Sequence, residues 1–298
     1  MNLLVVGKAK SGTTIISKTI QASAGVEHYH LEKRKLQFFE SQHLAQPLLV
    51  KLLFEDWGRR SNLLRGICLN EATLRFGKVV LIVRDPRDVL VSLLMFRSAQ
   101  LLADLPDEAT DEWIELLRRK ESFPRQQRVA VLFSQLGRIA GVNLEFARLV
   151  RSFLPWFNFV RDLGRKNVFC LKYEDFMRGR LQGLEAYLGF PIAADREVGA
   201  YVNTPRTRGV DNWKEFFMPA DLDQVDGLIG ARMRQLGYED WELGRAAPLA
   251  PEFYSDYVLK VIGNIRARRP APALLSPAAL QADADIAAGN ASSHSCPS

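Results

Sequence analysis

The 298-residue sequence predicts a single α/β domain with a central parallel sheet of four to five strands flanked by helices. Three short apolar runs carry this prediction, at Leu3–Val6, Lys78–Val83 and Asn167–Lys172. Continuous apolar runs of this length are typical of parallel strands that are buried on both faces. Each run is followed by polar residues and then by a helical pattern, as expected when strands and helices alternate along a chain.

The composition is ordinary for a globular protein, with 47% hydrophobic and 25% charged residues. The net charge of +6 favours anionic ligands but does not by itself indicate nucleic acid. The sequence contains no long basic run with interleaved aromatic residues, so we expect no nucleic-acid partner. The length is ample for one α/β core.

The three cysteines, Cys68, Cys170 and Cys296, form no C-x-x-C pair and no metal-ligand spacing, so we expect no metal. Scattered thiols indicate a reducing compartment, and Cys68 and Cys170 lie in apolar runs where we expect small buried side chains. No apolar stretch approaches 18 residues, which predicts no membrane span. The N-terminus lacks the features of a signal peptide, so we expect a cytoplasmic location.

The first loop has the layout of a phosphate cradle. Leu3–Val6 predicts a strand, a basic loop between Gly7 and Gly12 follows it, and a helix is expected from Thr13 to about residue 24. Loop N–H groups and a helix N-terminus at such a junction point at an anion. The spacing almost fits the P-loop pattern G-x-x-x-x-G-K-[ST], but Thr13 stands where the lysine belongs and Lys10 lies two residues before the second glycine. The loop therefore suits a nucleotide without the usual triphosphate and magnesium geometry.

A second anion-binding segment follows the strand Lys78–Val83. Asp85 is a plausible N-cap and Pro86 fits the first helical position, so a helix is expected to start there. Arg84 ends the strand, and Ser92 lies two turns into the helix. These two side chains can converge on one phosphate.

The chain between these segments is predicted to contain a helix and a strand. Residues Gln37–Trp57 have a helical pattern, and Gly66–Leu69 is a candidate second strand. Glu71 lies just after that candidate strand, at the edge where open α/β sheets bind ligands.

The remaining chain is predicted to be mostly helical. Helical patterns cover residues 94–160 and Leu222–Leu236, and Gly237 is a reasonable C-cap for the last of these helices. From Arg269 onward the sequence is rich in Ala, Pro and Ser and nearly uncharged. We therefore expect one domain over residues 1–268 and a disordered tail over residues 269–298.

Two of these motifs resemble those of one enzyme family. The run Lys10–Thr14 resembles the 5′-phosphosulfate loop of sulfotransferases that use 3′-phosphoadenosine 5′-phosphosulfate (PAPS), and Val83–Ser92 resembles their 3′-phosphate-binding segment. The sequence is thus identified as similar to sulfotransferases of the cytosolic or bacterial type, which have a P-loop-like fold. The resemblance implies a PAPS site formed by Lys10, Ser11, Gly12, Thr13, Thr14, Arg84 and Ser92.

The strand Asn167–Lys172 also leads into a family-like segment. The run Leu171–Phe176 looks like the one whose tyrosine lies by the adenine, which assigns that place to Tyr173. Many family members stack a tryptophan on adenine after the two loop threonines, whereas this sequence has Ile15 there. The resemblance therefore implies that adenine packs on Tyr173 and apolar neighbours.

A late basic segment, Arg206–Lys214, resembles the family loop that folds over the nucleotide, although Asp211-Asn212 replaces its Gly-Asp pair. Either Arg206 or Arg208 can be aligned with the same basic residue of that loop, so we retain both arginines, together with Gly209, as cofactor-binding candidates.

The implied reaction is in-line transfer of a sulfuryl group from PAPS to a hydroxyl or amine. Lys10 and the loop N–H groups are placed to stabilise the charge of the departing phosphate. An acceptor also needs a general base. The resemblance implies a histidine or glutamate base, and in the family the histidine usually follows the strand before the 3′-phosphate segment. No histidine follows the candidate strand Gly66–Leu69 here and Glu71 is the nearest titratable side chain, so we predict Glu71 as base, with His43 as second choice.

Two alternatives stay open. A P-loop kinase or other nucleotide phosphotransferase would share the cradle, although Thr13 argues against it. A non-catalytic nucleotide-binding module would keep the cradle without a base. The acceptor class is open among small-molecule, lipid and carbohydrate hydroxyls, and neither the acceptor nor the oligomeric state can be read from this sequence.

Overall fold

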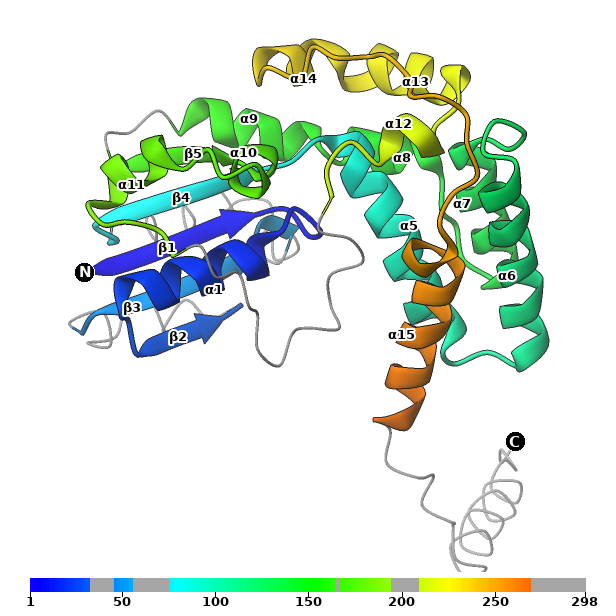
Figure 1. Ribbon diagram of the computed structural model, residues 1–298, viewed down its shortest axis with the longest axis horizontal. Coiled ribbons are helices and arrows are strands. Elements are labelled where there is room, and N and C mark those ends of the chain that lie inside the picture. Colours follow the sequence, from blue (N-terminus) through cyan, green and yellow to red (C-terminus); the bar gives the residue numbers. More distant parts are fainter. Residues whose placement is uncertain (33–45, 56–74, 164–166, 194–208, 269–298) are drawn as a thin grey trace, which may run out of the picture.

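The computed structural model describes residues 1–32, 46–55, 75–163, 167–193 and 209–268. The described residues form a five-stranded sheet with helices on its faces and further helices beyond one end of its strands (Figure 1), and every neighbouring pair of strands is parallel. The strand order is β2-β3-β1-β4-β5. The predicted parallel sheet of four to five strands is thereby confirmed. The strands are β1 (Asn2–Gly7), β2 (His28–Leu31), β3 (Leu48–Leu53), β4 (Lys78–Val83) and β5 (Val168–Lys172).

The first strand, β1, is the middle of the sheet. At its carboxyl end Gly7 is aligned with Leu53 of β3 on one side and with Ile82 of β4 on the other. The chain moves to β2 and β3 on one side of β1 and then crosses to β4 on the other side. The loop after β1 therefore lies at the point in an open α/β sheet where a ligand-binding crevice forms.

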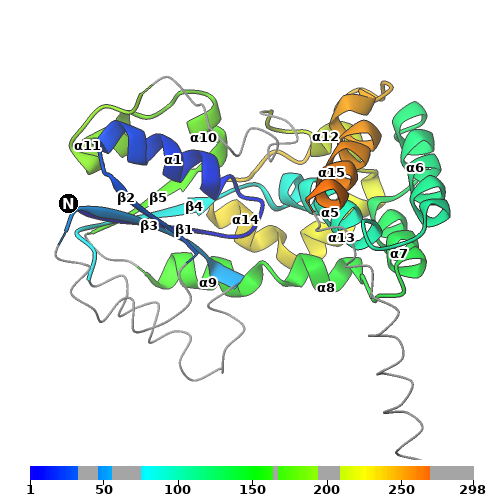
Figure 2. The same cartoon turned by 90° about the horizontal axis from the view of Figure 1, so that it is seen from below.

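The two faces of the sheet are covered by different helices (Figure 2). Alternate β1 residues point to opposite faces, so Leu3 and Val5 pack with Ile16 of α1 (Thr13–Ala24), as the predicted first helix requires. The short helices α10 (Tyr173–Met177) and α11 (Gln182–Leu188) contribute to the same cluster. On the other face Leu4 and Val6 belong to the larger core.

That larger core includes helices that extend beyond the carboxyl ends of the strands (Figure 1). The predicted helical region 94–160 is confirmed, as is the helical stretch that ends before Gly237, whose φ is 73°. Its middle, Asp226–Gly230, is a π-helical turn. A single 3-10 turn covers Pro251–Phe253. The helices are α5 (Pro86–Leu102), α6 (Asp107–Ser122), α7 (Val129–Ile139), α8 (Phe146–Arg151), α9 (Leu154–Asp162), α12 (Trp213–Phe216), α13 (Pro219–Val225), α14 (Ala231–Gln235) and α15 (Ser255–Ala267).

The helix predicted over Gln37–Trp57 is wrong over residues 46–53, whereas Phe54 and Glu55 are helical. Leu48–Leu53 forms the strand β3, whose first five residues are buried. Leucine has a high helix propensity, but a short apolar run can equally form a strand between two others. Here β3 fills the place between β1 and β2, so tertiary pairing outweighs propensity. The candidate strand Gly66–Leu69 lies outside the described residues.

The expectation that Cys170 is buried is also wrong. Cys170 is exposed on β5, which is an edge strand, and Leu171 is its one fully buried residue. Only part of this strand is covered because a sheet edge has a neighbour on one side. Cys68, Cys296 and the predicted tail, residues 269–298, lie outside the described residues.

Candidate functional site

A tight basic loop joins β1 to α1 at the carboxyl edge of the sheet. The backbone N–H and the hydroxyl of Ser11 both donate to the carbonyl oxygen of Lys8, at 3.1 and 2.7 Å. Lys10 and Gly12 have positive φ angles of 68° and 82°. Gly12 caps α1 without a side chain, so no capping group satisfies the first N–H groups of that helix, and such N–H groups are suited to binding an anion.

The glycines at both ends of the loop are required by packing. A Cβ atom on Gly7 would lie 2.6 Å from the Thr13 methyl group. A Cβ atom on Gly12 would lie 2.3 Å from the ring of Tyr173, and its left-handed φ is itself costly for other residues. The predicted adenine-side tyrosine is therefore buried against the loop glycine.

Residues that follow the two strands beside β1 contact the loop from opposite sides. After β3, the carboxylate of Glu55 accepts from Lys8 Nζ at 2.9 Å and from the Ala9 backbone N–H at 3.0 Å. After β4, Arg84 Nη1 donates to the Lys10 carbonyl oxygen at 3.0 Å. Lys10 thus lies between two anchored points. Its left-handed backbone is maintained by tertiary contacts.

Sequence reasoning missed Glu55 because the strand that precedes it, Leu48–Leu53, was predicted to be part of a helix. The signal was present, since an acidic residue follows two positions after the apolar run Leu48–Leu53. Once that run is known to be a parallel strand, Glu55 lies at the ligand-binding edge of the sheet.

The guanidinium of Arg84 is buried, with 9% of the residue exposed. It stacks on Tyr173, with Cζ 4.2 Å from the ring centroid, and Nη2 lies 3.6 Å from Asp88 Oδ2. Its Nε atom is buried and has no hydrogen-bond partner in the part of the chain that the structure describes. A buried charged donor without an acceptor is costly, so this N–H fits a site that an anion completes.

The side chain of Lys10 reaches from the loop to α5. Its Nζ atom lies 3.9 Å from the ring centroid of Phe96, a cation–π contact. Ser92 precedes Phe96 by one helical turn, so both lie on one face of α5. The fold thus brings Lys10 beside the helix that carries Ser92, whose residue is 8% exposed.

The buried carboxyl group of Glu174 binds the backbone of the residue that follows Arg84. Glu174, in the first turn of α10, accepts from the Asp85 backbone N–H at 2.9 Å and from the Tyr238 hydroxyl at 3.1 Å. Burial raises the pKa of Glu174 to about 7. Asp85 in turn caps α5, because its carboxylate accepts from the Arg87 backbone N–H.

Several predicted site residues cannot be placed. Glu71, His43, Arg206 and Arg208 lie outside the described residues, whereas Gly209 is described and exposed. Within the described ranges, no group of three or more His, Cys, Asp or Glu side chains could hold a metal ion. The helices among those residues include none long and apolar enough to cross a bilayer.

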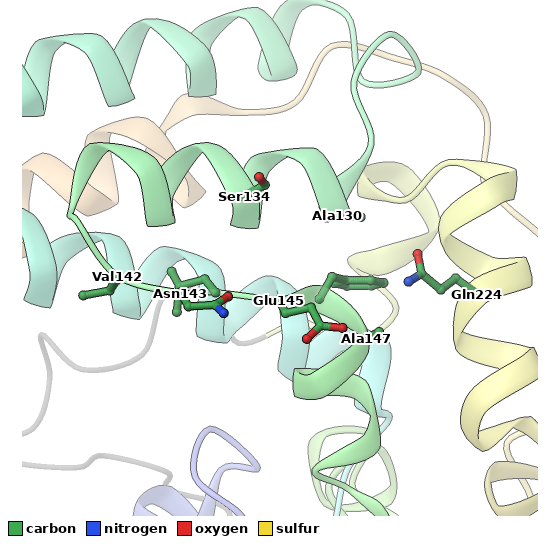
Figure 3. Close-up of a pocket in the computed structure, with 9 residues that line it drawn as sticks. Ala130, Ser134, Val142, Asn143, Glu145, Ala147 and Gln224 are labelled. Carbon is green, nitrogen blue, oxygen red and sulfur yellow. The ribbon is translucent and has the colours of Figure 1, made fainter.

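A cavity of about 440 Å³ lies elsewhere, between α7, α8 and α13 (Figure 3). Ser134, Asn143, Glu145 and Gln224 give it a partly polar lining. Its lining contains none of the loop residues and neither Arg84 nor Ser92. The candidate functional site is therefore the strand edge around Lys10 and Arg84.

Comparison with known proteins gives one family match. The family described as sulfotransferase domain matches residues 1–196. Similar solved structures include mouse sulfotransferase SULT7A1 complexed with PAP, at 17% identity and a TM-score of 0.44 over 80% of this chain and 85% of that one. Another is the sulfotransferase domain from the curacin biosynthetic pathway, at 14% identity and a TM-score of 0.44 over 80% and 97%. Curated protein sequences give no significant match.

Proposed function

Because the family match spans 196 of its 298 residues, the chain belongs to the sulfotransferase domain family, and we propose that PAPS is its sulfuryl donor. Sulfuryl transfer is the activity of the family, and PAPS would supply the sulfuryl group. The proposal concerns the donor, the residues that bind it and the acceptor.

The observation that carries the donor proposal is the buried Arg84 beside the loop. A nucleotide with phosphates at both its 5′ and 3′ positions needs two anion sites. The loop Lys10–Thr14 and the N-terminus of α1 suit the 5′ phosphosulfate. Arg84, with its buried unpaired Nε, and Ser92 suit the 3′-phosphate. A nucleotide that lacks the 3′-phosphate would leave that N–H unsatisfied.

In this proposal the ammonium group of Lys10 stabilises the negative charge of the phosphosulfate that binds at the loop. Contacts from Glu55 after β3 and Arg84 after β4 hold the backbone at Ala9 and Lys10 in place before the reaction. Little reorganisation is therefore needed as negative charge develops on the departing phosphate. Gly12, Thr13 and Thr14 are proposed to present loop and helix N–H groups to the same charge. Ser11 is proposed to shape this part of the site, because its N–H and hydroxyl groups both donate to the Lys8 carbonyl oxygen. Tyr173 and, from the late segment, Arg206, Arg208 and Gly209 are proposed to complete the nucleotide site.

The proposed acceptor is a hydroxyl or amine of a small molecule, lipid or carbohydrate. Glu71 is the proposed base and His43 its second choice, as the sequence predicts. Glu55 is a further candidate, because its carboxylate lies beside the loop at Ala9 and its side chain is 31% exposed. The scattered thiols support a proposed cytoplasmic location.

The decisive experiment is calorimetric titration of the purified protein with adenosine 3′,5′-bisphosphate, the product that PAPS leaves, and with ADP–magnesium. We expect micromolar binding of the bisphosphate and little binding of ADP. Preference for ADP–magnesium would favour a phosphotransferase instead. Binding of the bisphosphate without sulfate transfer to any acceptor in a screen would indicate a non-catalytic module.

A further inference from the structure

Asp88 is a fully buried carboxylate in the first turn of α5, with 0% of the residue exposed. Its two oxygens accept from two backbone N–H groups far along the chain. Oδ1 accepts from Trp213 at 3.0 Å and Oδ2 from Asp211 at 2.9 Å. The same Oδ2 atom lies 3.6 Å from Nη2 of Arg84. One carboxylate therefore contacts both the proposed 3′-phosphate arginine and the segment Asp211–Trp213.

The segment that Asp88 holds includes a left-handed backbone position. Asp211 has a φ of 63°, an angle that is uncommon outside glycine and that aspartate and asparagine adopt more often than other residues. Such angles persist where surrounding contacts over-determine the backbone. The Asp88 hydrogen bonds are among those contacts, together with a 2.7 Å ion pair between Asp211 and Arg178.

The far end of the segment is fixed as well. Trp213 is fully buried, and its ring lies 3.6 Å from Arg87 Cζ, which is held by both oxygens of Asp85. The segment therefore ends in a buried, packed residue, and the Asp88 carboxylate connects the segment to Arg84.

We propose that Asp88 is a positioning residue that ties the guanidinium of Arg84 to the segment Asp211–Trp213 and thereby sets selectivity for 3′-phosphorylated nucleotides. This inference rests on the proposed function. Arg84 has one fixed hydrogen bond to the loop, one stacking partner and the Asp88 carboxylate. With all three in place, its Nε edge is the part left for an anion.

The negative charge of Asp88 allows two possible roles to be told apart, positioning of the Arg84 guanidinium and partial neutralisation of its charge. A carboxylate 3.6 Å from Arg84 lowers the attraction of that site for a phosphate. Removing the charge would therefore strengthen anion binding if neutralisation were its only role. If Asp88 positions Arg84, removing it weakens binding of the 3′-phosphate instead.

The test is Asp88→Asn, with calorimetric binding of adenosine 3′,5′-bisphosphate and of AMP. An amide can accept from one of the two N–H groups but presents donors to the other, so the arrangement breaks. We expect the affinity ratio of bisphosphate to AMP to fall by at least about tenfold, which matches the loss of one hydrogen bond to a charged group. An unchanged or raised ratio overturns the inference.

The matched control is Asp221→Asn. Asp221 is also fully buried, and its Oδ2 accepts from the backbone N–H groups of Val129 and Met218 at 3.0 and 3.1 Å, away from the loop. Both variants should lose thermal stability, but Asp221→Asn should keep the wild-type ratio. If wild-type protein does not prefer the bisphosphate, the proposed function fails. If it does and Asp88→Asn keeps that preference, only the positioning role fails.

A measurement on the wild-type protein covers the case in which Asp88→Asn does not fold. Coupling between two sites is reciprocal, so a ligand at Arg84 should stabilise the hydrogen bonds that Asp88 accepts. We expect the bisphosphate to slow amide exchange at Asp211 and Trp213 at least about tenfold more than saturating AMP does. Equal protection by the two nucleotides overturns the inference.

Discussion

Arg84 Nη1 donates a hydrogen bond to the backbone carbonyl oxygen of Lys10, across 3.0 Å. Arg84 directly follows β4 and Lys10 follows β1, so the bond joins the loops after two adjacent parallel strands. It also joins the residues proposed for the 3′- and 5′-phosphate groups of one nucleotide. The two proposed phosphate sites are therefore joined by one direct contact.

Arg84→Ala should weaken binding of adenosine 3′,5′-bisphosphate by about 10- to 100-fold, because a charge-assisted hydrogen bond is lost. Binding of AMP, which has no 3′-phosphate, should weaken much less. Calorimetry with both nucleotides measures this difference. Arg138→Ala removes an exposed arginine on α7 and should change neither affinity. Equal losses for the two nucleotides would contradict the 3′-phosphate assignment.

Lys10→Met should lower kcat by about 10²–10³-fold, the range for loss of one preorganised charge-stabilising group. Methionine keeps the apolar stem against Phe96, so the protein should still fold. The rate is measured as labelled sulfate transfer from PAPS to an acceptor identified by screening. Lys18→Met in α1 is the control, since Lys18 stacks on Tyr29 rather than facing the loop. Similar activity in the two variants would remove Lys10 from catalysis.

The general base can be found by comparing Glu71→Gln with Glu55→Gln. Loss of a base typically lowers turnover by about 10²–10⁴-fold. We expect this loss in Glu71→Gln, with binding of adenosine 3′,5′-bisphosphate unchanged. Glu55→Gln should instead weaken nucleotide binding, because it loosens Lys8 and Ala9. Full turnover in Glu71→Gln would transfer the role of base to another residue.

Gly12→Ala should destabilise the protein more than Gly25→Ala. Both glycines have left-handed φ angles, 82° and 60°, which cost about 1–2 kcal/mol for alanine. A Cβ on Gly25 meets nothing within 4 Å, whereas one on Gly12 overlaps the Tyr173 ring. The overlap should add about 1–3 kcal/mol of overpacking. Urea unfolding measures both values, and equal losses would show that Tyr173 yields freely.

The free energy of unfolding should fall as pH rises through the pKa of Glu174. Burial raises the folded-state pKa of Glu174 from 4.5 to about 7, so between these values the folded protein binds more protons than the unfolded chain. Stability from this group is complete below pH 4.5 and is lost above pH 7, a total of about 3 kcal/mol by linkage.

Glu174→Gln tests this pH dependence. Glutamine resembles the protonated acid and can still accept from the Asp85 N–H, so the variant should lose that slope and exceed the wild type in stability at pH 8. Urea unfolding at several pH values measures the difference between the two proteins. Parallel pH profiles for the variant and the wild type would show that Glu174 ionises normally.

Local patterns predicted the elements that carry the motifs. Leu3–Val6 and Lys78–Val83 are short apolar runs followed by loops that suit anions, and each is a buried parallel strand. The helix starts at Thr13 and Pro86 were also predictable, because Gly12 and Asp85 are residues that occur at helix N-caps. Each of these signals consists of residues that are close together in the chain, so it can be recognised from the sequence alone.

The secondary-structure prediction failed where the local sequence was compatible with both a helix and a strand. Leu48–Leu53 can form a helix or a strand, and only its place between β1 and β2 decides for the strand. This error hid Glu55, whose carboxylate binds the loop from the end of that strand. Cys170 was misjudged for a related reason, since an apolar run does not reveal that its strand lies at the edge of the sheet.

Local patterns therefore sufficed to predict the α/β class and the strand-to-helix junctions that carry Lys10–Thr14, Arg84 and Ser92, because helix starts and buried strands depend on neighbouring residues. The strand order and the contacts that hold Lys10, Arg84 and Asp88 became visible only in the folded structure. Those contacts join residues far apart in the chain. They depend on how the elements pack, a property that no local pattern contains.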